Sequence, residues 1–362
     1  MKKNIKYYDL FEDLKKYNDY WCYVVWSKRG PGKTYSALKG CVSKGIKFLY
    51  IKRTQDDVDL ICTGNGDFNP FAPINRDTGR LVHPKRLRKG LGAFYNMVEG
   101  EDSNGEPTYE IDGDPLGYIF ALSAVAKYKG FDMSEVDIII FDEFIAQHGS
   151  RINHREGDML LDLYMTVARD REARGREPLK LVLMANAVNI YTPVTETLGI
   201  IDIMAEMLAE RAPIRCIEER GILLHWLIEA DYAVDPNRRK TGIEKAMQGT
   251  EWGRMAFGGE FSYNDFSQID SDSLKGYSPI CSFEYKADTF YVYQHKRKRV
   301  FYICKTKQKV QREYNLNRES EQYLFWREYG IVLREAVIND IIRFDSYIPY
   351  YLIMNYTTIF RV

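Results

Sequence analysis

The octapeptide Ser27-Lys28-Arg29-Gly30-Pro31-Gly32-Lys33-Thr34 directly follows an apolar run at residues 20–26. The apolar run predicts a strand, and residues 34–44 predict a helix. Between them, the glycines allow successive backbone N–H groups to point at one anion, and the helix N-terminus adds its dipole. The octapeptide therefore predicts a phosphate-binding loop (P-loop), in which Lys33 reaches the β- and γ-phosphates and Thr34 completes a Mg²⁺ shell.

The loop departs from the usual pattern at one position, because Ser27 replaces the first glycine of G-x-x-x-x-G-K-[ST]. A Gly-Lys-Thr turn without nucleotide is the alternative interpretation. Asn186 follows a predicted strand at 179–184, where its amide could sense a γ-phosphate or hold the attacking water; a simple turn asparagine is equally compatible. The candidate nucleotide-binding residues are Ser27, Lys28, Arg29, Gly30, Pro31, Gly32, Lys33, Thr34, Tyr35 and Asn186.

A second motif, Asp137-Ile138-Ile139-Ile140-Phe141-Asp142-Glu143-Phe144, is an apolar run that ends in two acids. Such a run is typical of a parallel strand buried on both faces, and open α/β sheets place their ligands at the carboxyl ends of these strands. Asp142 is then predicted to bind Mg²⁺ together with Thr34, and Glu143 to orient and deprotonate the attacking water. Alone, the motif could be a strand with a solvated acidic end; beside the P-loop it predicts hydrolysis of a nucleoside triphosphate.

The composition is that of a folded chain of 362 residues, with 45% hydrophobic residues and 51 basic against 51 acidic side chains. The balanced charge says nothing about partners. No apolar run has the length of a membrane span, and no signal-peptide core follows the first residues. The six cysteines form no C-x-x-C pair, which favours reduced core residues in a cytosolic protein and argues against a zinc site.

Strand-like and helix-like segments alternate through the first 210 residues, which predicts a parallel sheet covered by helices. A long insertion interrupts this alternation at residues 55–120, with a predicted hairpin turn at Asp112-Gly113-Asp114-Pro115. Beyond residue 230, runs of β-branched and aromatic residues predict antiparallel strands, followed by a closing helix at 333–344. We expect a P-loop domain at 1–215, a linker at 216–255 and a second domain at 256–362.

Two arginines, Arg169 and Arg171, lie late in the helix predicted after the acidic motif. Side chains at i and i+2 project differently, so we expect one to pack locally and the other to point away from its own subunit. A guanidinium delivered to a neighbour's γ-phosphate stabilises the transition state; the alternative is a solvated basic helix end. Two basic clusters, a predicted loop at 76–89 and a segment at 296–312, are equally compatible with nucleic-acid contacts and with solvated faces.

In this order, the motifs resemble those of the DNA-packaging ATPases of small protein-primed podophages (the phi29 type), relatives of the terminase large subunits. The resemblance rests on Arg29-Gly30-x-Gly32-Lys33-[Ser/Thr], Phe48-Leu49-Tyr50-Ile51, Phe141-Asp142-Glu143-Phe144-Ile145, Thr166-Val167-x-Arg169-x-Arg171-Glu172, Asn186-Ala187-Val188 and Gly249-Thr250-Glu251-Trp252-Gly253.

The resemblance implies roles for several residues. Arg169 looks like the family's trans-acting arginine, and Lys129 like a lysine that acts at the subunit interface. Asn186 falls where the family couples hydrolysis to movement, and Arg29 lies where packaging ATPases carry a basic residue beside the phosphates. The implied cofactors are ATP and Mg²⁺, and the implied catalytic residues are Glu143, Arg169 and Lys129.

The resemblance also implies the architecture: an α/β P-loop NTPase domain of the ASCE/RecA-like type, followed by a smaller α+β, ribonuclease-H-like domain. Because the acids of that second domain are scattered, we expect no nuclease activity from it. The implied function is an ATPase motor that translocates double-stranded DNA into a procapsid. It would work as a homo-oligomeric ring, a pentamer by resemblance, at the portal vertex in the host cytoplasm, and would be absent from the mature virion.

Whether an RNA adaptor joins these partners is left open by the sequence, and no membrane is implied. The alternatives are a helicase-type nucleic-acid ATPase outside packaging, and a DNA-binding or scaffold protein with a structural P-loop. A small-molecule kinase is disfavoured, because Glu143 supplies a base that would activate water.

Overall fold

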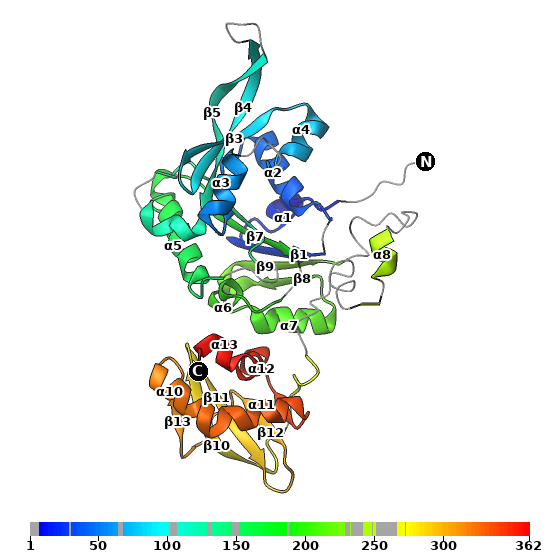
Figure 1. Cartoon of the computed structure of the whole chain (residues 1–362), viewed down its shortest axis with the longest axis vertical. Coiled ribbons are helices and arrows are strands. Elements are labelled where there is room, and N and C mark those ends of the chain that lie inside the picture. Colours follow the sequence, from blue (N-terminus) through cyan, green and yellow to red (C-terminus); the bar gives the residue numbers. More distant parts are fainter. Residues whose placement is uncertain are drawn as a thin grey trace. The chain divides into compact units, whose positions relative to one another are not determined.

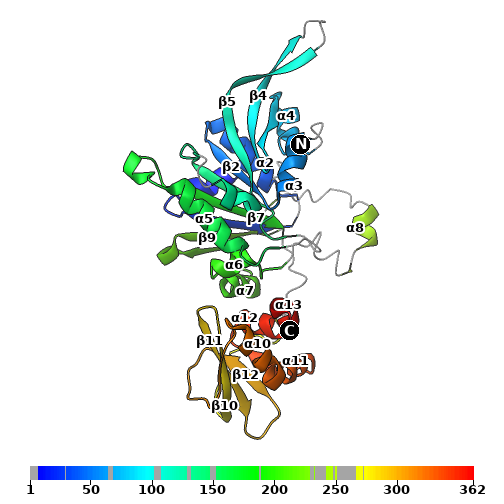
Figure 2. The same ribbon diagram turned by 60° about the vertical axis from the view of Figure 1, so that its left-hand side comes forward.

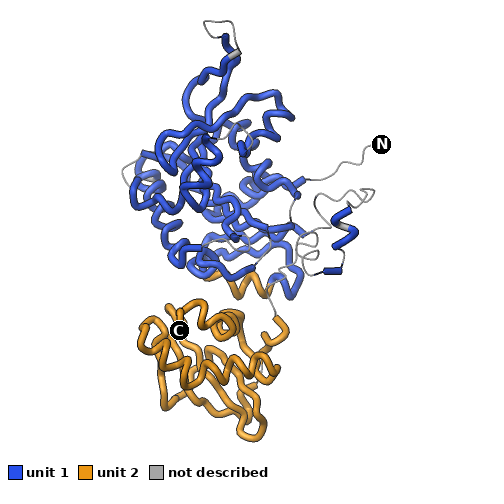
Figure 3. Tube along the Cα trace, in the orientation of Figure 1, with its two compact units in different colours: residues 1–198, 207–263 blue, residues 199–206, 264–362 orange. Residues whose placement is uncertain are grey.

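The chain folds into two compact units in the computed structural model (Figure 3). The first comprises Met1–Leu198 and Met207–Tyr263, and the second comprises Gly199–Glu206 and Asn264–Val362. Among the described residues, no helix has both the length and the apolar character needed to span a bilayer. The structure describes residues 7–28, 30–63, 68–101, 107–128, 132–146, 152–186, 189–228, 232, 242–247, 249–250, 266–271 and 273–362.

The first unit is built on a nine-stranded sheet with the order β3-β4-β5-β2-β6-β7-β1-β9-β8 (Figures 1 and 2). The strands from β5 to β9 in this order are mutually parallel where they pair. Every residue of β1 and β6 is buried, as expected for strands covered on both faces. The parallel strands are β1 (Cys22–Ser27), β2 (Phe48–Lys52), β5 (Pro107–Ala121), β6 (Ile138–Asp142), β7 (Lys180–Asn186) and β9 (Ile222–Leu227).

Helices alternate with these strands along the chain, so the α/β class predicted for the first domain is confirmed. The helices of this unit are α1 (Leu10–Lys16), α2 (Lys33–Lys44), α3 (Gln55–Thr63), α4 (Ala72–Thr78), α5 (Glu156–Ala168), α6 (Pro193–Thr197) and α8 (Gly242–Ala246). Helix α7 (Ile201–Glu210) is divided, with residues 201–206 in the second unit and 207–210 in the first. Short 3₁₀ turns add η1 (Leu122–Lys127), η2 (Glu172–Arg174) and η3 (Glu218–Arg220).

The insertion at 55–120 differs from its prediction. The hairpin turn predicted at residues 112–115 is wrong, because β5 runs through these residues without a break. The partner of β5 is β4 (Leu91–Glu101), and the two pair antiparallel from Leu91↔Phe120 to Glu101↔Pro107. The register shifts between Phe94↔Gly117 and Asn96↔Asp112, so residues 113–116 form a bulge within β5 and not a turn between two strands. The long hairpin extends beyond the rest of this unit (Figures 1 and 2).

The basic segment of the insertion is also not a loop. Residues Val82–Arg88 form β3, which pairs antiparallel with β4 at the edge of the sheet. The turn between them includes Gly90, whose φ of 75° suits glycine. Lys85, Arg86 and Arg88 are thus presented on an edge strand, a position where charge also prevents pairing with other sheets, whereas Arg76 lies in α4.

The linker predicted at 216–255 begins too early. Residues Ile214–Ile217 form β8 and residues Ile222–Leu227 form β9, which lies directly beside β1 with Val25 opposite His225. His225 interrupts the apolar run at residues 222–227, so the sequence signal for this strand is weak. In the fold His225 is buried and its Nδ1 lies 2.6 Å from Asp13 Oδ2, so the polar side chain is satisfied inside the sheet unit.

The second unit is a mixed five-stranded sheet with the order β13-β10-β11-β12-β14 and covering helices, in agreement with the predicted α+β class. The antiparallel strands are β10 (Tyr277–Tyr285), β11 (Asp288–His295) and β12 (Phe301–Cys304). The parallel edge strands are β13 (Glu313–Asn315) and β14 (Ile342–Phe344). The helices are α10 (Glu319–Phe325), a π-helical turn (Trp326–Gly330), α11 (Ile331–Ile338), α12 (Tyr347–Met354) and α13 (Tyr356–Phe360).

The closing helix predicted at 333–344 is wrong in its second half. Helix α11 ends at Ile338, and Asp340 follows in the left-handed region with a φ of 55°. The chain then pairs parallel with β12 as β14, and α12 and α13 come after it. The apolar residues Ile342 and Phe344 alternate with Arg343, a pattern that fits a strand in the core of this unit.

Gly117 provides a test of the packing between β2 and β5. A Cβ at this position would lie 2.6–2.7 Å from the ring of Phe48, which is buried against Phe71 and Phe94 and cannot move aside. We expect Gly117→Ala to lower the free energy of unfolding by about 1–3 kcal/mol. Chemical denaturation measures this change. Gly242→Ala is the control, since nothing lies within 4 Å of that position; equal stability of the two variants would contradict the packing described.

Candidate active site

The P-loop connects β1 to α2 through two glycines in left-handed conformations. Gly30 has a φ of 104° and Gly32 a φ of 93°, values that favour glycine. Helix α2 begins at Lys33, so its free N–H groups face the loop. Pro31 is buried, and its carbonyl accepts a hydrogen bond from the backbone N–H of Tyr8 at 3.0 Å. Arg29 lies outside the described residues.

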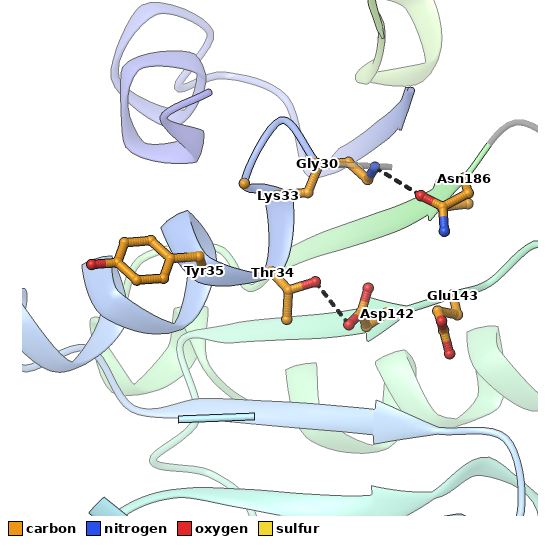
Figure 4. A pocket seen from close by; sticks show the side chains of 9 residues that line it. Gly30, Lys33, Thr34, Tyr35, Asp142, Glu143 and Asn186 are labelled. Carbon is orange, nitrogen blue, oxygen red and sulfur yellow. Dashed lines mark hydrogen bonds between the residues drawn. The ribbon is translucent and has the colours of Figure 1, made fainter. Parts of the chain in front are cut away.

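A pocket of about 280 Å³ opens where this loop meets the carboxyl ends of β6 and β7 (Figure 4). Parallel neighbours end at the same edge of a sheet, so β6, β7 and β1 deliver their last residues to one place. Apart from Ala185, every residue that lines the pocket is a predicted site residue. The lining residues are Gly30, Gly32, Lys33, Thr34, Tyr35, Asp142, Glu143, Ala185 and Asn186.

Lys33 is 7% exposed, and its amine reaches three oxygen atoms. Its Nζ donates to Ser27 Oγ at 2.5 Å, to the Lys28 carbonyl at 3.3 Å and to Asn186 Oδ1 at 3.3 Å. Burial lowers the pKa of Lys33 to about 8, although Asp142 and Glu143 oppose the shift. The serine that replaces the first glycine of the motif therefore contributes a hydroxyl that holds the lysine in this structure.

Thr34 and Asp142 form a hydroxyl–carboxylate pair at the base of the pocket (Figure 4). Thr34 Oγ1 donates to Asp142 Oδ2 at 2.9 Å, and the hydroxyl of Tyr50 donates to the same oxygen at 2.8 Å. Burial, and then the charge of Asp142, raise the pKa of Tyr50 well above its usual value, so it stays a donor. Hydroxyl and carboxylate oxygens are the ligands that Mg²⁺ takes beside phosphates, so the donor set fits this ion.

Glu143 follows directly after β6 and has a φ of 59°, a conformation that costs energy for a residue with a side chain. Its carboxylate lines the pocket, and Oε2 lies 3.5 Å from Nζ of Lys52 at the end of β2. The strained backbone directs the carboxylate differently from that of Asp142, which remains on the strand. The two adjacent carboxylates therefore have different surroundings, because Asp142 accepts from two hydroxyls and Glu143 lies beside an amine.

The remaining predicted site residues are Asn186, Tyr35 and Lys129. Asn186 is the last residue of β7, opposite Ser27 in the register, and its amide points toward Lys33 (Figure 4). The ring of Tyr35 faces outward, with its hydroxyl donating to Asp77 Oδ2 at 2.9 Å. Lys129 lies outside the described residues.

The two arginines after α5 are separated as the sequence suggests. Arg171 is buried and donates to Asp137 Oδ1 at 2.7 Å and to the carbonyl of Val136. Arg169 has a side chain that is 82% exposed, with Nε 3.7 Å from Asp170 Oδ2, and it does not line the pocket of its own chain. Its position is compatible with a role in a neighbouring subunit, which stays a prediction.

Two features around the pocket were not foreseen from the sequence. Helix α1 packs on the P-loop helix: Phe11 approaches Gly40, and the backbone N–H of Leu10 donates to Ser36 Oγ at 2.8 Å. Behind Glu143, Lys52 and Arg53 extend from the end of β2. For Lys52 and Arg53, the only signal in the sequence was that two basic residues follow an apolar run.

Comparison with known proteins places this geometry in a family. Residues 94–346, more than half of the chain, match the profile of the podovirus DNA encapsidation protein (Gp16) family. The chain belongs to this family. The match begins within β4, so the P-loop is identified by its own geometry.

Individual relatives agree with the family match. The DNA packaging protein of Bacillus phage B103 is 27% identical over 288 residues, which cover 76% of this chain and 74% of the relative. The DNA packaging protein of Bacillus phage phi29 is 25% identical over 240 residues, or 64% of this chain and 60% of the relative.

Among solved structures, a chain of the bacteriophage Phi-29 viral genome packaging motor assembly superposes with a TM-score of 0.65 at 20% identity, covering 98% of this chain and 99% of that one. The Phi-28 gp11 DNA packaging motor gives a TM-score of 0.61 at 14% identity, covering 99% of each. At these identities the similarity supports the fold alone, and the matched residues come from both units.

The lowered pKa of Lys33 predicts a pH-dependent affinity. Above pH 8 the amine becomes neutral and no longer attracts phosphate, so we expect binding of a fluorescent ATP analogue to be about tenfold weaker at pH 9 than at pH 7. Equilibrium titration measures this step. In Lys33→Gln the affinity should be low and the step absent; a step of the same size in that variant would show that another group causes it.

Proposed function

We propose that this protein is the ATP-hydrolysing motor that translocates double-stranded viral DNA into a preformed procapsid. The observation that carries the proposal is the single pocket in which Lys33, the Thr34–Asp142 pair and Glu143 converge. Family membership supports the packaging role, since relatives in this family are DNA packaging proteins. The pocket supports ATP hydrolysis as the energy source, because it brings together the side chains that phosphoryl transfer to water requires.

The chemistry follows from the positions of the side chains. The Lys33 amine and the backbone N–H groups of Gly30 and of residues 32–34 would bind the ATP phosphates. Thr34 and Asp142 would hold Mg²⁺, which neutralises charge on the β- and γ-phosphates. Glu143 orients a water whose oxygen attacks the γ-phosphorus, and it accepts the proton released as the bond to the bridging oxygen breaks. Asn186 lies beside Lys33, where its amide can sense the terminal phosphate.

The remaining parts of the proposal concern assembly. The exposed Arg169 is assigned to the pocket of the next subunit in a ring, with Lys129 acting at the same interface. The expected partners are double-stranded DNA and the portal, with a pentameric ring in the host cytoplasm; an RNA adaptor is left to experiment. The second unit is assigned to binding DNA or the portal without nuclease activity. In the described residues, no group of three or more His, Cys, Asp or Glu side chains is arranged to hold a metal.

The first test replaces the proposed base. We expect Glu143→Gln to retain ATP binding and to lose turnover by about 10²–10⁴-fold, because the amide cannot accept the proton. Turnover is measured with and without long duplex DNA, and DNA should stimulate the unaltered protein. Glu135→Gln is the matched control, since Glu135 lies at the opposite end of β6, paired with Lys47 at 3.3 Å. Unchanged hydrolysis in Glu143→Gln would refute the role of this residue.

The second test asks whether Arg169 acts in a neighbour. Arg169→Ala should lower turnover by about 10³-fold or more, as for other arginines that act on a transferring phosphate. Mixing Arg169→Ala with Glu143→Gln subunits should restore part of the turnover, because some interfaces then combine an intact Glu143 with an intact Arg169. Arg174→Ala, which alters an exposed arginine nearby, is the control. A mixture no more active than its separate components would contradict the assignment.

A further inference from the structure

Arg53 bridges the segment that carries Glu143 and the first residue of α5. Its Nε donates to Glu156 Oε1 at 2.5 Å, and its Nη2 donates to Glu156 Oε2 at 3.2 Å. The same Nη2 donates to the backbone carbonyls of Glu143 at 3.3 Å and Phe144 at 2.9 Å. One planar guanidinium thus joins a carboxylate on α5 to the backbone that positions the proposed base.

This bridge lies in nearly dry surroundings. The Glu156 side chain is 2% exposed and that of Arg53 15%, and the guanidinium lies over the ring of Phe141, 5.6 Å from its centroid. Burial raises the pKa of Glu156, an effect that the hydrogen bond and charge of Arg53 oppose. With so little access to water, neither charge has a good alternative partner, so the two segments stay joined.

The start of α5 is also fixed from its other side. Gly157 follows Glu156, and a Cβ there would collide with Thr197 Oγ1 and the carbonyl of Pro193 in α6. Helix α6 is itself held by a capping box between Thr192 and Thr195. The amino-terminal end of α5 therefore cannot shift toward α6 to leave Arg53.

The opposite end of α5 leads to Arg169. The helix has 13 residues from Glu156 to Ala168, a length of about 20 Å, and Arg169 is its C-terminal capping residue. A continuous helix of this length transmits a displacement from one end to the other. The Glu143 backbone and Arg169 are therefore connected through Arg53, Glu156 and one rigid element.

We propose that Arg53 and Glu156 are positioning residues that keep the Glu143 backbone in register with helix α5, so that the base of one pocket and the arginine offered to the next move together. The inference rests on the proposed function, because it takes Glu143 as the base and Arg169 as a group acting in the neighbouring subunit. It adds a physical route by which a phosphate bound to Arg169 would change the position of the Glu143 backbone on the same chain. Such coupling would order firing between adjacent subunits.

The experiment removes the bridge without leaving a buried charge. Single removal of Arg53 would strand Glu156, whereas the double variant Arg53→Met/Glu156→Leu replaces the pair with apolar side chains, a change that buried ion pairs commonly tolerate. We expect the thermal midpoint and the affinity for a non-hydrolysable ATP analogue to be retained, because neither residue lines the pocket. We expect kcat to fall by about 10–100-fold, because a misplaced base slows the chemical step and not binding.

The matched comparison uses two conservative substitutions. Arg176 bridges Asp137 and the carbonyls of Ser134 and Glu135 at the amino end of β6, as Arg53 does at the carboxyl end. Lysine cannot reproduce the fork of either arginine, but Arg53 alone of the two holds the Glu143 backbone, so Arg53→Lys should lower kcat and Arg176→Lys should not. Equal kcat for the unaltered protein, Arg53→Lys and the double variant would overturn the positioning role. Absence of turnover in the unaltered protein would instead refute the proposed function itself.

Coupling to the next pocket is tested by a double-mutant cycle on kcat. If Arg53 connects Glu143 to Arg169, then Arg169→Lys should reduce turnover less in the Arg53→Lys background than in the unaltered protein. Independent effects, whose fold-changes multiply, would overturn the connection through α5.

Discussion

The site depends on one constraint: β6, β7 and β1 are adjacent, parallel and in register, so their last residues end at a common edge. Asp142, Asn186 and Ser27 are those last residues. The P-loop can curl over this edge because β1 lies between β7 and β9 and is held on both sides. Without that order, Lys33 would have neither the hydroxyl of Ser27 nor the amide of Asn186 within reach.

The electrostatics of the pocket follow from this crowding. An amine, two carboxylates and three hydroxyls share a small volume, and each has hydrogen-bonding partners or an opposite charge nearby. Burial weakens the hold of Lys33 on its proton. A triphosphate entering the pocket would favour the charged amine again, so ligand binding and protonation are linked.

The sequence predicted those parts of the fold that short-range patterns determine. Buried strands are continuous apolar runs, and the P-loop and the acidic strand end are contiguous motifs, so Lys33, Asp142 and Glu143 could be assigned from neighbouring residues alone. Tyr50, Arg53 and Glu156 could not, because their roles depend on contacts with residues 90–103 positions away. The hairpin of β4 and β5 was misplaced for a similar reason, since cross-strand pairing on both sides of residues 113–116 turned the local glycine–proline signal into a bulge.

The packing of α1 against the P-loop and helix α2 has a practical consequence. Tyr8 is hydrogen-bonded to Pro31, and Leu10 to Ser36 on the helix that begins with Lys33. Any affinity tag, dye or fusion partner joined close to these residues would disturb the backbone of the P-loop. Attachment elsewhere on the chain is the sounder choice for bead-tethered or fluorescence measurements, because a slowed enzyme could otherwise be mistaken for a stalled one.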